Sequence, residues 1–462
     1  MIPSDLAVKE DRAAGKTREF LGRAGTATVG SASAAFFWLS AFYLVYCARP
    51  EDWIPGLLAL PLAKITAVFA LIALISSSGR TKRKFRDRPK EANYLLALIA
   101  LLFVSGMLSP VWKLGALSHT LDFSKVVVAW MLTFMVVTDF KQLRRIIYIQ
   151  AASVAVIAIV SIIKGHDTPR LFGVLGGIYS NPNDLAFAIV LSLPFCLAFL
   201  LSANSGLKKL AWGIGILFMF GALFLTASRA GFIDLVVAGT VCLWHMGVKG
   251  RRYTLIVVAL VVVTIMMLVA GGLLKQRFEA ISGEDMATKD DTQAYTSYEA
   301  RAQLMRQAVE AIVHYPILGI GVDNFVTLSG DWHEVHMTYL QIAVEGGIPA
   351  FIIYLLFFAR GFRNLRRLRR RADLDVETTL FVGALHSSLI GFVVGALFAP
   401  EAYQFFPYFA VAFTAVLLNI VEPRDSSAPI TTGPLDRTVT RRSRSLDIYA
   451  IDPRSGSLAS RN

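Results

Sequence analysis

The longest polar interruption in this chain covers residues 274–347 and reads LKQRFEAISGEDMATKDDTQAYTSYEARAQLMRQAVEAIVHYPILGIGVDNFVTLSGDWHEVHMTYLQIAVEGG. Apolar runs long enough to cross a bilayer flank it on both sides. Because lipid cannot satisfy the hydrogen bonds of irregular backbone, the polar part must lie wholly on one side of the membrane. Any chemistry that it carries is then confined to that side.

The composition predicts a polytopic membrane protein of the all-α class. The chain has 462 residues, of which 55% are hydrophobic and 17% charged, so a soluble fold would leave too much apolar surface exposed. The formal charge of +13 lies mostly in short connections and in the two tails, so it reports the topology of the helices. It does not predict a nucleic-acid partner. Twelve apolar runs predict about twelve transmembrane helices, near residues 33–48, 54–76, 93–110, 120–138, 143–163, 183–201, 210–227, 230–247, 253–274, 336–358, 378–398 and 404–420.

Basic residues predict the orientation of these helices. They fill the connections after the second, fourth, sixth, eighth and tenth helix, and cytoplasmic loops collect Lys and Arg. Both termini are therefore predicted to be cytoplasmic, and the other connections to face outward. This divides the chain into a cytoplasmic tail (1–32), helices one to nine (33–274), an extracytoplasmic loop (275–335), helices ten to twelve (336–420) and a disordered cytoplasmic tail (421–462).

The outer loop is predicted to contain one amphipathic helix. Thr296 and Glu299 form a capping-box pattern ahead of apolar residues at helical spacing, which predicts a helix over about 297–314. Tyr315-Pro316 would end it, and Gly-Ile-Gly at 319–321 would make a tight turn. The glycine pair is no nucleotide fingerprint, because no strand precedes it.

Three arginines of the predicted outer face are candidate anion ligands. Arg229 lies in the short break TASRAG (226–231) and is either an interfacial anchor or a ligand of carbonyls, a carboxylate or a phosphate. Arg170 is either a solvated surface charge or a functional cation. Arg301 lies early in the amphipathic helix, where the helix dipole disfavours a cation. Either Arg301 binds an anionic partner, or it forms a solvated ion pair with Glu299 or a loop aspartate.

His336 begins the tenth predicted helix. The helix dipole favours the neutral form of an imidazole at this position, and that is the form that a general base requires; the alternative is a polar residue at a membrane boundary. His333 and His336, with Asp331 and Glu334, lack the i, i+4 spacing of a zinc helix, so no metal is predicted. The three cysteines fall in apolar runs at unrelated spacings, at Cys47, Cys196 and Cys242. They are therefore predicted to be packing residues and not to form disulfides or a metal knuckle.

Four charged residues fall within apolar runs. Lys64, Lys125, Asp234 and Glu345 would be costly in lipid, so we expect them to face the protein interior or a cavity. Lys125 and Asp122 either pair within one turn or line a proton or substrate path.

Several short motifs share the predicted outer face. They are RLFG (170–173), NPNDLA (181–186), SRAG (228–231), Arg301, HYPILGIG (314–321), His336 with Tyr339 and Leu340, and EGG (345–347). In this combination, over roughly residues 170–350, the chain resembles the O-antigen ligase and polymerase superfamily of bacterial inner-membrane glycan transferases.

The resemblance implies a transferase that takes a glycan from an undecaprenyl-diphosphate carrier and joins it to an acceptor hydroxyl in the periplasm. It implies no cofactor, neither a metal nor a nucleotide sugar. In that family the positions matching Arg229 and Arg301 are associated with the donor's diphosphate, and Arg170 is carried over as a further substrate-binding residue. The position matching His336 is associated with activating the acceptor. The family often has asparagine after this histidine, whereas Met337 stands here, which leaves the acceptor open.

We therefore predict a periplasm-facing glycosyltransferase of the O-antigen ligase type in the bacterial inner membrane. His336 would be catalytic, and Arg229, Arg301 and Arg170 would bind the substrate. The partners would be a lipid-linked glycan donor and a glycan, lipid or protein acceptor. The alternatives are an O-antigen or exopolysaccharide polymerase, a protein O-glycosylation ligase and, from a different class, a twelve-span transporter that depends on Lys64, Lys125 or Asp234.

Overall fold

The computed structural model describes residues 34–54, 56–57, 60–77, 83–165, 170–173, 178–179, 181–262, 264–265, 289–330 and 334–422. For residues 289–300 it describes the backbone alone. All of these residues belong to the first of two units, residues 1–424. The predicted tails, 1–32 and 421–462, lie outside the described residues except for Val421 and Glu422.

The described residues form helices and no strand, which confirms the predicted class. Within the described ranges, eight helices are long and apolar enough to cross a membrane: α4 (Lys90–Met107), α5 (Lys113–Val136), α6 (Phe140–Lys164), α7 (Pro182–Ser202), α8 (Gly206–Leu225), α9 with the π-helical turn η2 (Arg229–Leu243 and Trp244–Val248), α13 (Thr338–Arg369) and α14 (Val376–Gly395). Four shorter apolar helices are Ala34–Ala48, α3 (Leu62–Ser76), Tyr253–Val262 and α15 (Phe405–Val421). These helices overlap the twelve predicted runs in order, but for the four shorter ones the crossing stays a prediction.

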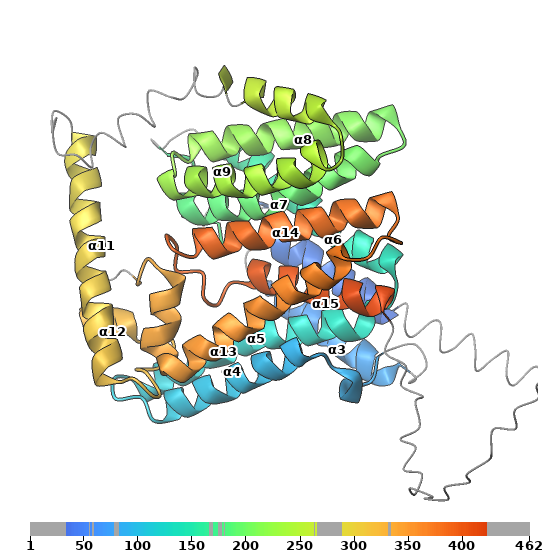
Figure 1. The fold of residues 1–462 in the computed structure, drawn as a ribbon. Helices are drawn as coiled ribbons and strands as arrows, with labels where there is room; N and C mark the ends of the chain where they lie inside the picture. The colour runs from blue at the N-terminus through green and yellow to red at the C-terminus, as the bar shows by residue number, and fades with distance from the viewer. Residues whose placement is uncertain are drawn as a thin grey trace, which may run out of the picture. The chain divides into compact units, whose positions relative to one another are not determined.

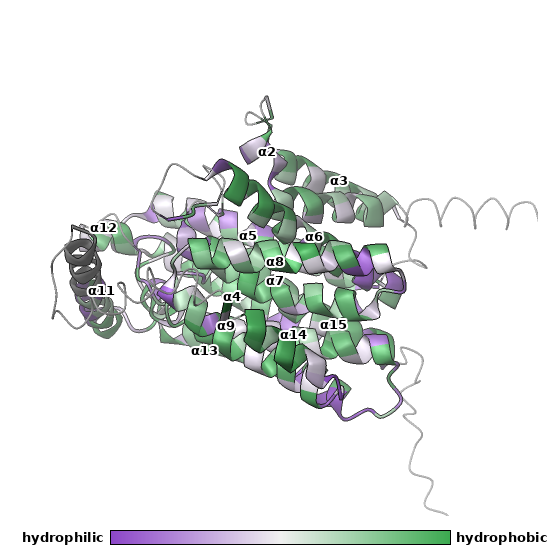
Figure 2. Cartoon of the chain, turned by 90° about the horizontal axis from the view of Figure 1, so that it is seen from above, coloured by the Kyte–Doolittle hydropathy of each residue, from purple (hydrophilic) through white to green (hydrophobic). Residues whose placement is uncertain are grey.

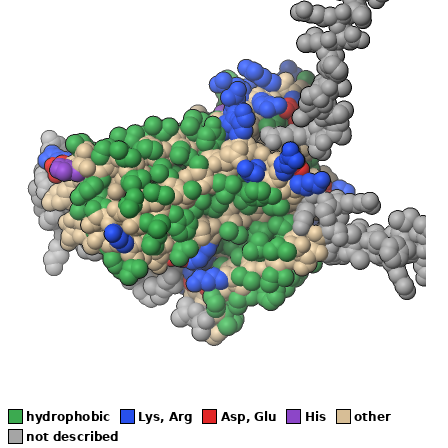
Figure 3. Space-filling view, turned by 90° about the horizontal axis from the view of Figure 1, so that it is seen from below, with side chains coloured by type: hydrophobic (Ala, Val, Ile, Leu, Met, Phe, Trp, Pro, Cys, Tyr) green, Lys and Arg blue, Asp and Glu red, His purple; other side chains and the backbone are tan. Residues whose placement is uncertain are grey.

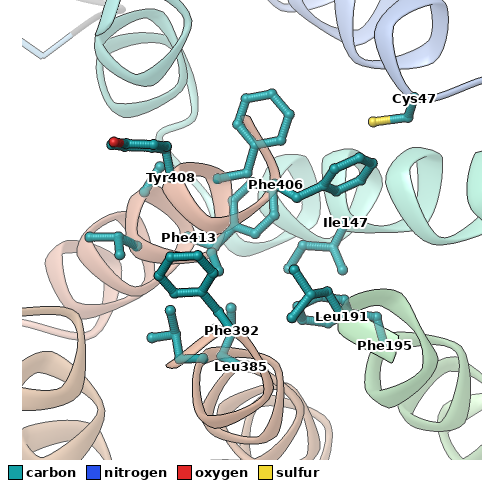
Figure 4. Close-up of a cluster of buried hydrophobic side chains, with 14 of the residues drawn as sticks. Cys47, Ile147, Leu191, Phe195, Leu385, Phe392, Phe406, Tyr408 and Phe413 are labelled. Atoms are coloured by element: carbon teal, nitrogen blue, oxygen red, sulfur yellow. The ribbon is translucent and has the colours of Figure 1, made fainter. Parts of the chain in front are cut away.

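The core lies where α7 meets its neighbours. α7 packs against α6, α8, α9 and α14, and most of its side chains are buried. Phe195 of α7, Phe392 of α14 and Phe406 of α15 belong to one large apolar cluster (Figure 4). The helices are apolar along most of their length (Figure 2), and apolar side chains also remain on the outside. Leu207 is 77% exposed and Ile75 is 71% exposed, and hydrophobic side chains cover the middle of the face in Figure 3, as expected of a surface in contact with lipid.

The connections predicted to face outward gather at one end of these helices, which we call the loop end. Hydrogen bonds join them to one another or to the nearby helix ends: Lys164 to Trp53, Tyr179 to Cys47, Asn324 to Trp112, and Thr338 to Ala399. Two further helices belong to this end, α11 (Lys289–His314) and the short α12 (Phe325–Ser329). α11 runs across the ends of the other helices (Figure 1).

The predicted beginning of the amphipathic helix is wrong. α11 begins at Lys289, eight residues before 297, so Thr296 and Glu299 lie inside it. Residues 289–296 contain neither glycine nor proline, so nothing there ends a helix. Arg301 therefore lies in the middle of α11, and the argument that the helix dipole disfavours it does not apply.

Two other predicted boundaries need correction. The second apolar helix begins at Leu62 rather than at residue 54, because Gly56 adopts φ +90° and Pro61 precedes the helix. The tenth helix does not end at residue 358 but continues to Arg369, since arginine and leucine are good helix formers and Leu365 and Leu368 are buried.

α13 contains a break at Gly347, whose φ of 78° and ψ of 174° are not helical. Pro349 has no N–H to donate to the carbonyl of Glu345, and the N–H of Ile348 donates instead to Pro316, at 2.8 Å. The freed carbonyls of α13 accept hydrogen bonds from the Gly-Ile-Gly turn. The HYPILGIG and EGG motifs are thus joined backbone to backbone.

The charged residues within apolar runs divide into two groups. Asp234 and Glu345 are each 1% exposed, and the Tyr403 hydroxyl donates to Glu345 at 2.6 Å, so the prediction that they face the interior is confirmed. For Lys64 and Lys125 it is wrong, because both side chains are exposed. Lys64 lies in the first turn of α3, and Lys125 pairs with Asp122 on the helix surface. The three cysteines are buried and free, as predicted.

Candidate active site

Arg170 holds the turn that precedes α9. Its Nε donates to the carbonyl of Thr226 at 2.9 Å, and one terminal nitrogen donates to Oδ1 of Asn183 at 3.3 Å. The Ser228 hydroxyl donates to the same Asn183 oxygen at 2.8 Å and caps α9 by accepting from the N–H of Gly231. Arg170 is thus half-buried and hydrogen-bonded, which excludes the solvated surface charge considered above.

This network fixes the first residue of α9, which is Arg229. Asn183 lies in the first turn of α7 and accepts from both Arg170 and Ser228. The RLFG, NPNDLA and SRAG motifs therefore meet around one amide side chain.

Arg301 of α11 lies close enough to Arg229 for their charges to interact. Burial lowers the pKa of Arg301, and the positive charge of Arg229 lowers it further. An arginine nonetheless stays charged at neutral pH. Two guanidinium groups in this position repel each other, so an anion lying near both would be stabilised.

An apolar cluster packs α11 against the beginning of α13. We call it the outer cluster; its buried members are Leu304, Ala308, Ala311, Ile320, Phe325, Val335 and Val344. Leu304 lies one turn after Arg301, and Met337 packs against the same cluster. Met337 precedes α13 without capping it through its side chain. Met337, which follows His336, thus packs against the same cluster as Leu304 of α11.

His336 lies two residues before α13, and its ring is oriented by a backbone carbonyl. Nδ1 lies 3.0 Å from the carbonyl oxygen of Glu334. Because a carbonyl oxygen can only accept, Nδ1 carries the proton in this contact. In the neutral ring, Nε2 is then the unprotonated nitrogen, which is the state of a general base.

The carboxyl group of Glu334 interacts electrostatically with Asp184 in the first turn of α7. Burial raises the pKa of Glu334 to about 7, with the carboxylates of Asp323 and Asp184 adding to the rise, while the hydrogen bond from Gln341 at 3.1 Å opposes it. Burial also raises the pKa of Glu401 well above its usual range, again with Asp184 nearby. These charge interactions place the segment before α13 next to the first turn of α7.

The four residues singled out from the sequence therefore lie at the loop end. Arg170 donates to the turn that leads into Arg229, Arg301 interacts with Arg229, and His336 is linked through Glu334 to the residue after Asn183. Sequence reasoning gave no role to Asn183 and considered Glu334 only as a metal ligand. Neither role has a local signal, because each depends on contacts between distant segments.

The described residues contain no group of three or more His, Cys, Asp or Glu side chains arranged to hold a metal ion. Asp331 and His333, considered above as ligands, lie outside the described residues.

Among curated proteins none matches this chain. Residues 214–355 match a family model described as O-Antigen ligase. The match contains Arg229, Arg301 and His336, and it extends from α8 to the first half of α13. Members of this family are membrane enzymes of the glycosyltransferase or ligase type. Residues 214–355, less than half of the chain, are thus similar to the O-antigen ligase family, which supports a place in the O-antigen ligase superfamily.

Proposed function

We propose that this protein transfers a glycan from an undecaprenyl-diphosphate carrier to an acceptor hydroxyl on the periplasmic side of the bacterial inner membrane. The observation that carries the proposal is the arrangement at the loop end. Two like-charged arginines from different helices lie near each other, and a histidine whose Nδ1 faces a backbone carbonyl lies at the same end.

The arginine pair suits the diphosphate of the donor. Guanidinium groups bind phosphate oxygens through charge-assisted, often bidentate hydrogen bonds. Arg229 lies at the beginning of α9, whereas Arg301 comes from α11, which crosses the loop end. A lipid-linked donor would keep its chain in the bilayer and bring its diphosphate between these two helices.

The proposed reaction balances as a displacement at the anomeric carbon. Nε2 of His336 accepts the proton of the acceptor hydroxyl, and the acceptor oxygen bonds to the anomeric carbon of the donor glycan. The bond from that carbon to the phosphate oxygen breaks, and the electron pair leaves with the lipid diphosphate. Arg229 and Arg301 stabilise the negative charge that develops on this leaving group.

A polymerase that joins repeat units, or a protein O-glycosylation ligase, would use the same donor and the same residues and differ only in the acceptor. The family often has asparagine at the position of Met337, and this difference bears on which acceptor is used. The transporter alternative has less support, because Lys64 and Lys125 are exposed and only Asp234 is buried.

The test is transfer of labelled glycan from its lipid carrier by the purified full-length protein in detergent, where no gradient can drive transport. We expect transfer by the wild type and a loss of about 10²- to 10⁴-fold in His336→Ala, the range of general base catalysis. His314→Ala is the matched control, because His314 is exposed on α11. Equal transfer by both variants would remove His336 from the reaction, and no transfer by the wild type with any glycan, lipid or peptide acceptor would contradict the proposed function.

A further inference from the structure

Two adjoining cavities lie at the far end of α13, away from the candidate active site. One has a volume of about 350 Å³ and is lined by Lys249, Phe362, Arg366, Arg369, Arg370 and His386. The second, of about 610 Å³, runs along α13 and shares Phe362, Arg366 and Arg370 with the first. The smaller cavity is built from three elements, since Lys249 follows η2 and His386 belongs to α14.

The cations that line the smaller cavity lack acidic partners among the described residues, whereas Arg367, which lines the larger one, pairs with Glu422. Nearby acidic side chains are engaged elsewhere: Glu377 with Arg144, Asp373 with Arg371, Glu422 with Arg367 and Arg371, and Asp375 with the first turn of α14. None of them forms an ion pair with Lys249, Arg366, Arg369 or Arg370. Several positive charges are thus held together with no neutralising group, which favours an anionic ligand.

The inner wall of the smaller cavity combines an apolar ring with an imidazole. Phe362 and His386 lie edge to face with ring centroids 6.1 Å apart, and His386 is hydrogen-bonded to His245 of η2 through Nδ1, at 2.9 Å. The other ring nitrogen of His386 has no hydrogen-bond partner among the described residues. It remains available to a ligand in the cavity.

Exposed aromatic and apolar side chains place the cavities at the level of a membrane surface. Trp244, beside His245, is 51% exposed, and tryptophan is enriched where lipid headgroups meet hydrocarbon. On α13, Ile352, Leu355 and Leu356 are exposed along the turns that precede the cavities. A ligand with a phosphate and acyl chains could therefore place its charge among the arginines and its chains along these residues.

We propose that the two cavities form a binding site for the phosphate-bearing headgroup of an anionic phospholipid. The ligand is a lipid rather than free phosphate because apolar side chains continue from the cavities along α13. The C-terminal segment of the chain is a poor alternative, because residues 423–462 contain seven arginines and only four acidic residues. Basic pockets between transmembrane helices are a recurrent form of lipid recognition.

The test is native mass spectrometry of the full-length protein in detergent, titrated with phosphatidylglycerol or with phosphatidylcholine. Arg366→Gln/Arg370→Gln removes the two arginines shared by both cavities. Lys84→Gln/Arg86→Gln removes the same charge from the exposed segment before α4 and serves as the control. With each cation contributing about a fivefold factor, we expect phosphatidylglycerol to bind the first variant roughly 30-fold more weakly than the wild type, and the control unchanged.

Three results would overturn the proposal. Equal weakening in the control would show a general effect of surface charge. Equal affinity of the wild type for phosphatidylcholine would remove the requirement for an anionic headgroup. Full displacement of phosphatidylglycerol by millimolar inorganic phosphate would identify free phosphate, and not a lipid, as the ligand. None of these readouts depends on glycan transfer.

Discussion

The hydrogen bond between His336 and the carbonyl of Glu334 determines which ring nitrogen can take up a proton. Nδ1 is occupied as a donor, so Nε2 is the basic atom in the neutral ring. The same residue, Glu334, carries a half-buried carboxyl group that interacts with other carboxylates, and its charge state affects the stability of the site. One residue thus orients the proposed base through its backbone and sets the local electrostatics through its side chain.

Glu334→Gln should remove a pH dependence of stability. The pKa of Glu334 is raised to about 7 from an ordinary value near 4.5, so the folded protein binds this proton more tightly than the unfolded chain does. The free energy of unfolding then falls as the pH rises from 4.5 through 7, by at most about 3 kcal/mol. We expect Glu334→Gln, which resembles the protonated form, to melt at a higher temperature than the wild type at pH 8 and similarly at pH 5. Glu310→Gln, on the exposed face of α11, is the control; parallel melting profiles for the wild type and Glu334→Gln would contradict the account.

At the scale of elements, the outer loop is attached to the membrane helices at the break in α13. A Cβ on Gly347 would lie 2.4 Å from the carbonyl oxygen of Ile317, and one on Gly319 would lie 2.5 Å from the backbone of Glu345. Both glycines also have positive φ, at 78° and 67°. Only glycine allows the two backbones to approach this closely. The approach places the segment carrying His336 beside the turn that follows α11.

Gly347→Ala should therefore destabilise the protein more than Gly330→Ala. Gly330 has a similar φ of 70°, but a Cβ there meets nothing within 4 Å. Backbone strain alone costs about 1–2 kcal/mol, which we expect for Gly330→Ala. Gly347→Ala adds a backbone clash, and we expect a total of about 3 kcal/mol or more, measured as the shift of the unfolding transition in detergent. Equal shifts for the two variants would show that the close approach contributes nothing.

Much of the helix arrangement could be predicted from apolar runs, because each run is bounded by charged residues, glycine or proline. The beginning of α11 could not, since residues 289–296 are polar and have no apolar period. The extension of α13 to Arg369 was missed because a run of arginines resembles a loop when only hydropathy is considered. The placement of Arg229, Arg301 and His336 at one end could be predicted from charge, whereas the contacts made by Asn183 and Glu334 could not. Asn183 accepts from Ser228, 45 residues further along the chain, and Glu334 interacts with Asp184 of a distant helix.

At the scale of the whole described unit, the two ends of the helices have different chemistry. The loop end holds buried carboxyl groups together with Arg170, Arg229 and Arg301, and the opposite end carries the arginines of α13. The positive-inside rule assigns this second end to the cytoplasm. The candidate active site would then face the periplasm.

Thiol labelling in intact bacteria tests this orientation. The three native cysteines are buried, so they give little background. Gln303→Cys lies on the exposed side of α11 at the loop end, and Lys208→Cys lies at the opposite end, at the beginning of α8. We expect a membrane-impermeant maleimide to label Gln303→Cys in intact cells once the outer membrane is permeabilised, and Lys208→Cys only after the inner membrane is broken. The reverse pattern would place the candidate site in the cytoplasm.

The most direct test of the central claim, that Arg229 and Arg301 together hold the diphosphate of a glycan donor, is the rate of glycan transfer in Arg301→Gln compared with Arg306→Gln. Both residues belong to α11 and carry the same charge, but Arg301 is half-buried and close to Arg229, whereas Arg306 is exposed. We predict a loss of transfer of about 10²-fold or more in Arg301→Gln, in the range of a removed oxyanion ligand, with Arg306→Gln close to the wild type. Wild-type transfer by Arg301→Gln would contradict the account.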